Sequence, residues 1–242
     1  MPKFTYSFER YEMKYLITQE QKTGLLDLMS KHMIPDAFGK SSIRNIYLDT
    51  PDRRLIVNSL DHPKFKEKMR IRSYGTATDD DTVFVELKRK YKSVVYKRRV
   101  SMTNAEALDY VFGGPPPKNN QITREIDRFM KFYENLEPAM FISYEREAFF
   151  AKDDGTFRMT FDENILWRDR DLSLCKEAYG EPILPPETFL MEIKTAYSIP
   201  LWLTAFLSEN GIFKTSFSKY GLAFSAQMNK KRNGSILNGQ LI

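Results

Sequence analysis

The sequence predicts an α+β domain in which long antiparallel strands form a barrel and helices pack outside it. Apolar and polar residues alternate with a period of two in many segments, a pattern typical of strands that are buried on one face. Segments with helical periodicity and capping residues fall between them. The stretch 113–120, rich in glycine and proline, has strand patterns on both sides, so we expect residues 1–229 to form a single domain.

The alternation that predicts strands is clearest in three segments, 83–88, 157–162 and 189–194. In the first, Val83, Val85 and Leu87 alternate with Phe84, Glu86 and Lys88. Similar runs cover 4–17, 43–49, 64–74, 93–101 and 139–150, with a weaker one at 165–174.

Helices are predicted between these strands. Thr18 and Gln21 form a capping-box pattern ahead of an apolar run at 25–29, and Pro51 follows a capping Asp49-Thr50 pair. Further helices are expected at 104–112, 122–133, 200–209 and 219–228. The polar segment 230–242 is expected to be a disordered C-terminal tail.

The composition excludes several classes of protein. The 242 residues include 37 Lys and Arg against 32 Asp and Glu, a net charge of +5, and one cysteine and two histidines. One cysteine and two histidines are too few for a His/Cys zinc site, and they argue against a hydrolase with a catalytic histidine. Neither a glycine-rich phosphate loop nor a kinase signature occurs. Without a signal peptide, an apolar span or stacking motifs, we expect a cytoplasmic protein with no membrane span and no nucleic-acid partner.

Positively charged residues recur on the polar faces of the predicted strands. For any one strand, the charged residues are explained by a polar face that points to solvent. Together they also fit a barrel whose charged face lines a tunnel for a phosphate chain, because Arg forms bidentate bonds to phosphate oxygens. Carboxylates among the cations would then hold Mg²⁺ or Mn²⁺. The face-sharing sets are Arg10, Glu12 and Lys14; Lys66, Lys68, Arg70 and Arg72; Glu86, Lys88 and Lys90; Lys97 and Arg99; Tyr144 and Arg146; Arg158 and Asp162; Glu192 and Lys194.

Eight short segments resemble one known family when they are taken in order. They are RYEMKY (10–15), RNIYLDT (44–50), KMRIRSYG (68–75), VELK with KRR (85–88, 97–99), YER (144–146), RMTFD (158–162), LMEIK (190–194) and SFSKY (216–220). Over about residues 4–228 the chain resembles the polyphosphate polymerase (VTC) domain of the CYTH-like triphosphate tunnel metalloenzyme superfamily. The resemblance implies an eight-stranded antiparallel tunnel that binds ATP and inorganic polyphosphate. It also implies transfer of the ATP γ-phosphate onto a growing polyphosphate chain with a divalent metal, Mn²⁺ or Mg²⁺.

The same resemblance assigns roles to individual residues of this chain. Glu192 is the implied metal ligand. The catalytic residues implied are Arg70, Arg72, Lys88 and Lys219. The phosphate-binding and nucleotide-binding residues implied are Lys14, Lys97, Arg99, Tyr144, Arg146, Arg158, Lys194 and Ser218.

One departure from the superfamily pattern affects the expected reaction. The usual E-x-E-x-K motif is replaced by Arg10, Glu12 and Lys14, so one carboxylate that could support a second metal or activate water is a cation here. This favours a polymerase over a hydrolase. Two alternatives stay open: a tunnel triphosphatase acting on inorganic or nucleoside triphosphate, and a non-catalytic module that binds polyphosphate.

Overall fold

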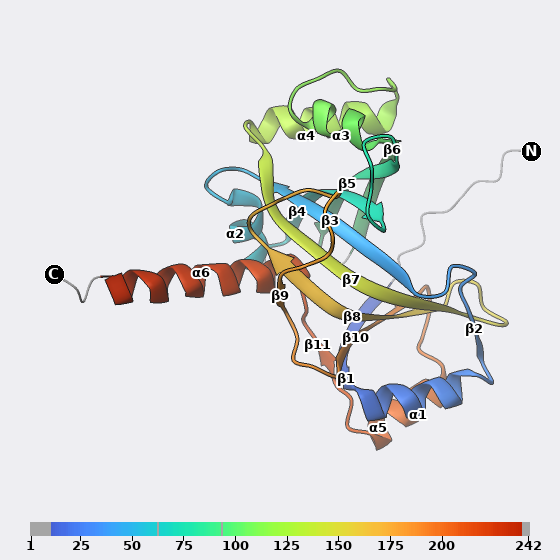
Figure 1. Ribbon diagram of the computed structural model, residues 1–242. Helices are drawn as coiled ribbons and strands as arrows, with labels where there is room; N and C mark the ends of the chain where they lie inside the picture. Colours follow the sequence, from blue (N-terminus) through green and yellow to red (C-terminus); the bar gives the residue numbers. More distant parts are fainter. Residues whose placement is uncertain (1–10, 62, 93, 239–242) are drawn as a thin grey trace, which may run out of the picture.

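A computed structural model describes residues 11–61, 63–92 and 94–238 of the chain (Figure 1). The six helices within these residues are α1 (Gln19–Met29), α2 (Arg54–Leu60), α3 (Asn104–Val111), α4 (Gln121–Tyr133), α5 (Leu201–Glu209) and α6 (Lys219–Asn238). The strands are β1 (Tyr11–Thr18), β2 (Met33–Pro35), β3 (Ser41–Asp49), β4 (Phe65–Tyr74), β5 (Thr82–Tyr91), β6 (Val94–Thr103), β7 (Glu137–Ala151), β8 (Arg158–Arg168), β9 (Glu181–Pro182), β10 (Thr188–Thr195) and β11 (Lys214–Thr215).

These strands form one antiparallel sheet, which confirms the predicted α+β class. Its order is β11-β1-β10-β8-β7-β3-β4-β5-β6, with β2 and β9 paired to β7 and β8. The prediction of a closed eight-stranded barrel is wrong for the described part of the chain. The sheet there has eleven strands, and its two ends, β11 and β6, do not pair with each other.

The open sheet nevertheless curls. Lys88 of β5 lies 3.5 Å from Glu12 of β1, although β10, β8, β7, β3 and β4 separate these strands in the sheet. Such a contact requires the two halves of the sheet to face each other, which the accumulated twist of adjacent strands allows. The charged side chains on this inner side are therefore brought close together from both halves.

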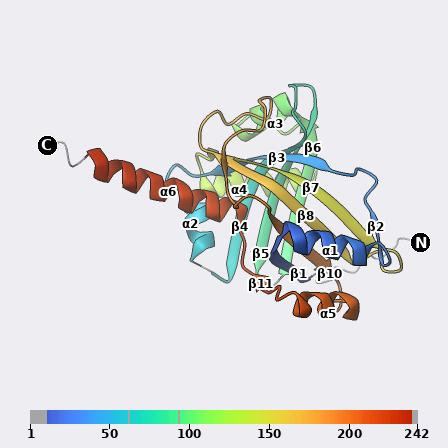
Figure 2. The same cartoon turned by 60° about the horizontal axis from the view of Figure 1, so that its bottom comes forward.

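The apolar face of the sheet is covered by two pairs of helices. One core contains Met69, Val85 and Leu87 of β4 and β5, packed against α3 and α4. A second core contains Met191 and Ile193 of β10, packed against α1 and α5. Figure 1 shows α3 with α4 at one end of the molecule and α1 with α5 at the other, and Figure 2 shows the second pair from below.

Helix α6 packs on the opposite, charged side of the sheet, which corrects the expectation that all helices lie outside. Tyr220 and Phe224 of α6 share a buried cluster with Ile43, Ile142 and Leu190, whose side chains point to the charged side. The helix continues to Asn238, beyond its predicted end, and projects from the body (Figure 1). Residues 230–238 are thus helical where a disordered tail was expected, and 239–242 lie outside the described residues.

The capping predictions agree with the hydrogen bonds. The Thr18 hydroxyl accepts from the Gln21 amide at 3.2 Å, and the Gln21 side chain accepts from the Thr18 amide at 3.0 Å. The Asp49 carboxylate accepts the Leu55 and Ile56 amides of α2 at 2.9 and 3.0 Å. None of the described helices is both long and apolar enough to cross a membrane.

Candidate functional site

The register of the strands places the predicted site residues on one face, called here the charged face. Directly paired residues of an antiparallel sheet point to the same side. On β4, β5 and β6, Arg70 lies opposite Glu86 and Glu86 opposite Arg99. On the other half of the sheet the corresponding pairs are Lys14 with Glu192, Lys194 with Arg158, and Arg146 with Asp162. The period-two pattern therefore identified the face correctly.

Glu86 is the centre of the first group of contacts on this face. Its carboxylate accepts from Arg70 Nε and Nη2 at 2.8 and 2.7 Å, and lies 2.7 Å from Lys97 Nζ and 3.1 Å from Arg99 Nε. Arg72 Nε is 3.8 Å away, and Glu86 is only 1% exposed. Burial alone would raise the pKa of Glu86, but the surrounding cations outweigh it and hold that pKa well below its usual range. Four predicted site residues thus share one buried counter-ion.

Asp162 is the centre of the second group. It is fully buried, accepts from Arg146 Nε and Nη2 at 2.5 and 2.7 Å, and pairs with Lys219 Nζ at 2.5 Å. The Lys219 ammonium also lies 4.3 Å from the centre of the Tyr144 ring. Burial would raise the pKa of Tyr144, but the nearby Arg72, Arg146 and Lys219 charges lower it to about 8. Tyr144 accepts from Arg72 Nη2 at 3.1 Å and so links the two groups.

Glu192, the predicted metal ligand, is the centre of the third group. Its carboxylate lies 2.5 Å from Lys194 Nζ and 3.8 Å from Lys14 Nζ, while Glu12 lies 3.4 Å from the same Lys14 atom. Burial opposes ionisation of Glu192, yet the Lys194 and Lys14 charges hold its pKa well below the ordinary value. Glu12 also contacts Lys88 at 3.5 Å. No cluster of three or more acidic, histidine or cysteine side chains suited to a metal occurs within the described residues.

The beginning of α6 meets this charged face. Ser218 caps the helix, since its hydroxyl accepts from the Gly221 amide at 3.1 Å. The same hydroxyl accepts from Lys68 Nζ of β4 at 2.8 Å, and the Phe217 carbonyl accepts from Lys14 Nζ at 2.9 Å. A helix N-terminus attracts anions, so α6 adds a further favourable position for phosphate beside the lysines.

Arg158 is the one predicted site residue on the described strands that the three groups leave out. It lies on the charged face opposite Lys194, but its guanidinium is 3.5 Å from Asp36 and stacks 4.8 Å from the centre of the Phe150 ring. Its side chain is 38% exposed. No contact described in residues 11–61, 63–92 and 94–238 joins Arg158 to Glu86, Asp162 or Glu192.

Glu86, Asp162 and Glu12 were expected on this face, but the sequence pattern assigned them no individual role beyond the general expectation that carboxylates there hold a metal. Each could have been recognised as an acidic residue on the charged face of a strand, with basic residues at other positions of the same face. Lys68, which the strand pattern groups with Arg70 and Arg72, is half-buried against Ser218 of α6. Lys66 instead donates to the Ser59 carbonyl at 2.9 Å. Arg10, the departure from the family motif, lies outside the described residues.

Lys68 gives the site a testable pH dependence. Burial, followed by repulsion from nearby cations, lowers the pKa of Lys68 to about 7. A lysine with a lowered pKa is charged below that pH and neutral above it, so polyanion affinity should fall as the pH rises through 7. A bound polyanion favours the charged form, so we expect proton uptake when tripolyphosphate binds at pH 7.5. The neighbouring cations are Lys14, Lys66, Arg70 and Lys88.

Calorimetry in two buffers with different heats of ionisation measures this proton uptake. Lys68→Met should take up fewer protons than the wild-type protein, whereas Lys131→Met, at an exposed position of α4, should match it. Equal uptake by Lys68→Met and the wild-type protein would contradict the assignment.

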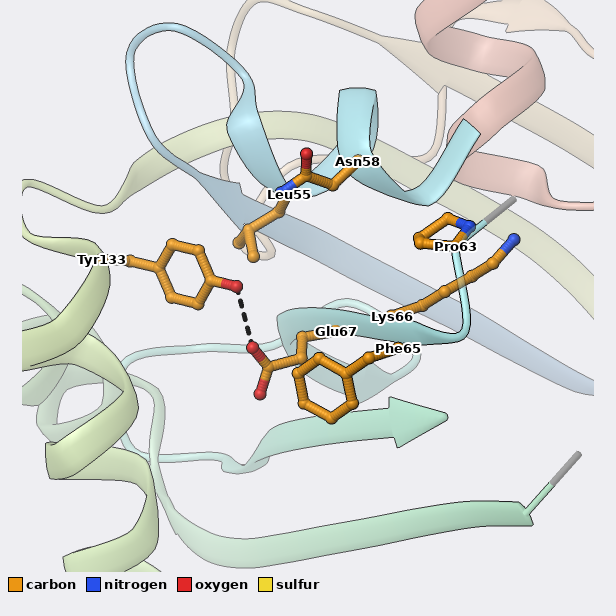
Figure 3. A pocket seen from close by; sticks show the side chains of 7 residues that line it. All are labelled: Leu55, Asn58, Pro63, Phe65, Lys66, Glu67 and Tyr133. Carbon is orange, nitrogen blue, oxygen red and sulfur yellow. Dashed lines mark hydrogen bonds between the residues drawn. The ribbon is translucent and has the colours of Figure 1, made fainter. Parts of the chain in front are cut away.

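A cavity of about 270 Å³ lies away from these three groups. It is lined by residues of α2, the start of β4 and the end of α4, and Figure 3 shows Tyr133 donating to Glu67 within it. Glu67 is also bound by Arg89 at 2.6 Å. None of the predicted site residues lines this cavity, and its buried carboxylate is already paired, so we place the candidate site on the charged face instead.

Comparisons with known proteins bear directly on this site. The model of the VTC domain family matches residues 9–227. The chain belongs to the VTC domain family. A search of curated proteins finds no match. The family resemblance predicted from the eight short segments is therefore confirmed. All the predicted site residues that lie on strands of this VTC domain are found on its charged face.

Two solved structures show the same fold at low sequence identity. One is described as a candidate adenylate cyclase from Bacillus halodurans, with a TM-score of 0.53 and 14% identity, covering 86% of this chain and 92% of that chain. The other is a candidate adenylyl cyclase from Hippeastrum described as having a dominant triphosphatase activity, with a TM-score of 0.51 and 15% identity. It covers 90% of this chain and 96% of that chain.

Proposed function

We propose that this VTC domain is an ATP-dependent polyphosphate polymerase. One observation supports it most: Lys68, Lys88 and Lys97 lie directly opposite one another on β4, β5 and β6. Like charges at directly opposed positions destabilise a sheet, and here burial lowers the pKa of all three lysines. A bound polyanion relieves this repulsion, and a chain of phosphates has the repeated charge that such a row fits.

The remaining groups fit the parts of a phosphoryl-transfer site. Such transfer depends on alignment and on neutralising charge, and an anionic chain end needs no general base. Arg70 and Arg72 of β4 bind the phosphates of ATP. Lys219 and the N-terminus of α6 bind the end of the growing polyphosphate chain. The terminal phosphate is the acceptor, and its negative charge is favoured by the lysine and by the helix N-terminus. The absence of histidine from these groups is consistent with this chemistry.

The carboxylates present also fit a divalent metal. Glu12 and Glu192 both lie within 4 Å of Lys14 Nζ, so two carboxylates already share one cation. Mg²⁺ is commonly bound by one or two carboxylates together with substrate phosphates, and Mn²⁺ prefers the same oxygen ligands. Glu192 and Glu12 are the residues that would hold it. When bound, the metal supplies positive charge at the phosphate oxygens.

A tunnel triphosphatase is the second candidate. The Hippeastrum protein, which has the same fold, is described as having a dominant triphosphatase activity. Arg10 in place of a carboxylate weakens this alternative, because a hydrolase benefits from a further acidic residue to activate water. A non-catalytic module that binds polyphosphate is the third candidate, supported by the same charged face.

One assay separates the three candidates. The purified protein is incubated with ATP and Mn²⁺, and the products are resolved by length. We expect long-chain polyphosphate, and we expect chelation of the metal to prevent its formation. Orthophosphate without polymer would favour the triphosphatase and reject the polymerase. If the protein binds polyphosphate in a salt-sensitive way but does not turn over ATP with Mn²⁺ or with Mg²⁺, the binding module is favoured.

A further inference from the structure

The row of cations along β4 ends in an aromatic side chain. Lys68, Arg70, Arg72 and Tyr74 occupy alternate positions, so all four point to the charged face. Tyr74 is 52% exposed, whereas Arg72 next to it is 6% exposed. The charged face therefore changes at this position from buried phosphate-binding groups to an accessible ring.

The Tyr74 ring is held in place by two neighbours. Phe84, which lies opposite Arg72 on β5, meets it in a T-shaped contact with ring centres 5.8 Å apart. Arg99 Nη2 donates to the Tyr74 hydroxyl at 3.1 Å, and the Arg99 guanidinium stacks 3.4 Å from the centre of the Phe84 ring. Arg99 Nε is also 3.1 Å from Glu86. One guanidinium thus connects the two aromatic rings to the first group of phosphate-binding residues.

We propose that Tyr74, supported by Phe84 and Arg99, stacks against the base of a nucleoside triphosphate; this inference rests on the proposed function. Aromatic rings and Arg guanidinium groups are the side chains on which nucleobases stack, and a ring already fixed loses little freedom on binding. Two residues along a strand cover about 7 Å, so a base at Tyr74 leaves room for the ribose before the first phosphate reaches Arg72. The phosphates then continue past Arg70 toward Lys68 and α6.

This orientation makes a prediction about substrate class. Inorganic tripolyphosphate has no base, so it uses the cations but gains nothing from Tyr74. Stacking tolerates different bases because every base has a flat face. The site therefore distinguishes nucleoside triphosphates from inorganic triphosphate without selecting strongly among the bases.

Binding of ATP and of tripolyphosphate to single-site variants tests the inference. Tyr74→Leu keeps an apolar side chain but removes the ring, and we expect about tenfold weaker ATP binding, in line with the known effect of losing one base-stacking contact. Tripolyphosphate binding should be unchanged, which also shows that the variant is folded. Tyr74→Phe should keep the affinity for ATP, because the ring and not the hydroxyl makes the stack. Tyr91→Leu is the matched control, since Tyr91 is 49% exposed on β5 and points to the opposite face.

The outcomes separate this inference from the proposed function. Unchanged ATP binding by Tyr74→Leu, or an equal loss for ATP and tripolyphosphate, overturns the stacking site alone. A wild-type protein that binds neither ligand overturns the proposed function, and the stacking site with it. Selective loss of ATP affinity in Tyr74→Leu, absent from Tyr91→Leu, supports the inference.

Discussion

Arg72→Ala is expected to reduce the rate of polyphosphate synthesis by about 10² to 10³-fold, the effect of removing one preorganised donor from a site where charge develops. Arg72 is oriented before substrate arrives, since Nε donates to Asn45 at 2.9 Å and Nη2 donates to Tyr144 at 3.1 Å. Neither bond uses Nη1. The side chain is nearly buried, so its charge acts in a poorly solvated environment.

The matched control for this experiment is Arg98→Ala. Arg98 lies on β6 beside Lys97 and Arg99 but points to the opposite face, where it pairs with Glu125 at 2.7 Å. Arg72→Lys adds a second comparison, because it keeps the charge but loses the planar fork that orients on Asn45 and Tyr144. We expect Arg98→Ala to retain full activity and Arg72→Lys to be intermediate. Activity of Arg72→Ala within about twofold of the wild-type rate, well below the loss expected for such a donor, would remove Arg72 from the site.

The loss in Arg72→Ala should reflect function and not unfolding. Glu86 keeps Arg70, Lys97 and Arg99 as partners after the substitution, so its buried charge stays compensated. Thermal unfolding of the variant, measured beside the activity, checks this expectation.

Local sequence patterns predicted the strands and the identity of the charged face well. A period of two in 83–88 or 189–194 determines which side chains share a face without any knowledge of the partner strand. Whether the sheet closes into a barrel or stays open was not predictable in this way. Pairing between the first and last strands depends on the twist summed over all the strands between them. The eight-stranded barrel came from the family resemblance, and the described sheet remains open.

The position of α6 on the charged side could have been predicted from apolar residues in the strands. Ile43, Ile142 and Leu190 are apolar residues at positions that alternate with the outer apolar face, so they had to be covered on the charged side. The importance of Glu86 and Asp162 was harder to predict than that of Glu192. Both look like ordinary members of a mixed polar face until the fold places basic residues of other elements around them, from β4 and β6 around Glu86 and from β7 and α6 around Asp162.

Glu86→Gln is expected to destabilise the ligand-free protein by about 3 to 5 kcal/mol, the usual effect of removing one partner from a buried ion pair. The glutamine keeps the size of the side chain but leaves Arg70, Arg72, Lys97 and Arg99 without their shared negative charge. Glu125→Gln is the control, because its partner Arg98 is partly exposed and such pairs contribute at most about 1 kcal/mol. Denaturant unfolding at neutral pH measures both variants.

The pH dependence of unfolding gives a second measure of Glu86. Its pKa is lowered in the folded protein, so its stabilising effect is fully present above the unfolded value of about 4.3 and is lost as the pH falls through the folded value. Glu86→Gln should therefore lose less stability on acidification than the wild-type protein. A variant with the same acid sensitivity as the wild-type protein would show that other carboxylates dominate that loss.

Tripolyphosphate distinguishes a structural role of Glu86 from a role in the charged face. A polyanion that binds the folded protein stabilises it by mass action, and it brings negative charge to the same guanidinium groups that Glu86 neutralises. The gain in unfolding free energy on adding tripolyphosphate should thus be larger for Glu86→Gln than for the wild-type protein. An equal gain would mean that the phosphates bind away from Glu86. A larger gain would mean that the carboxylate holds the arginines in place until phosphate replaces its charge.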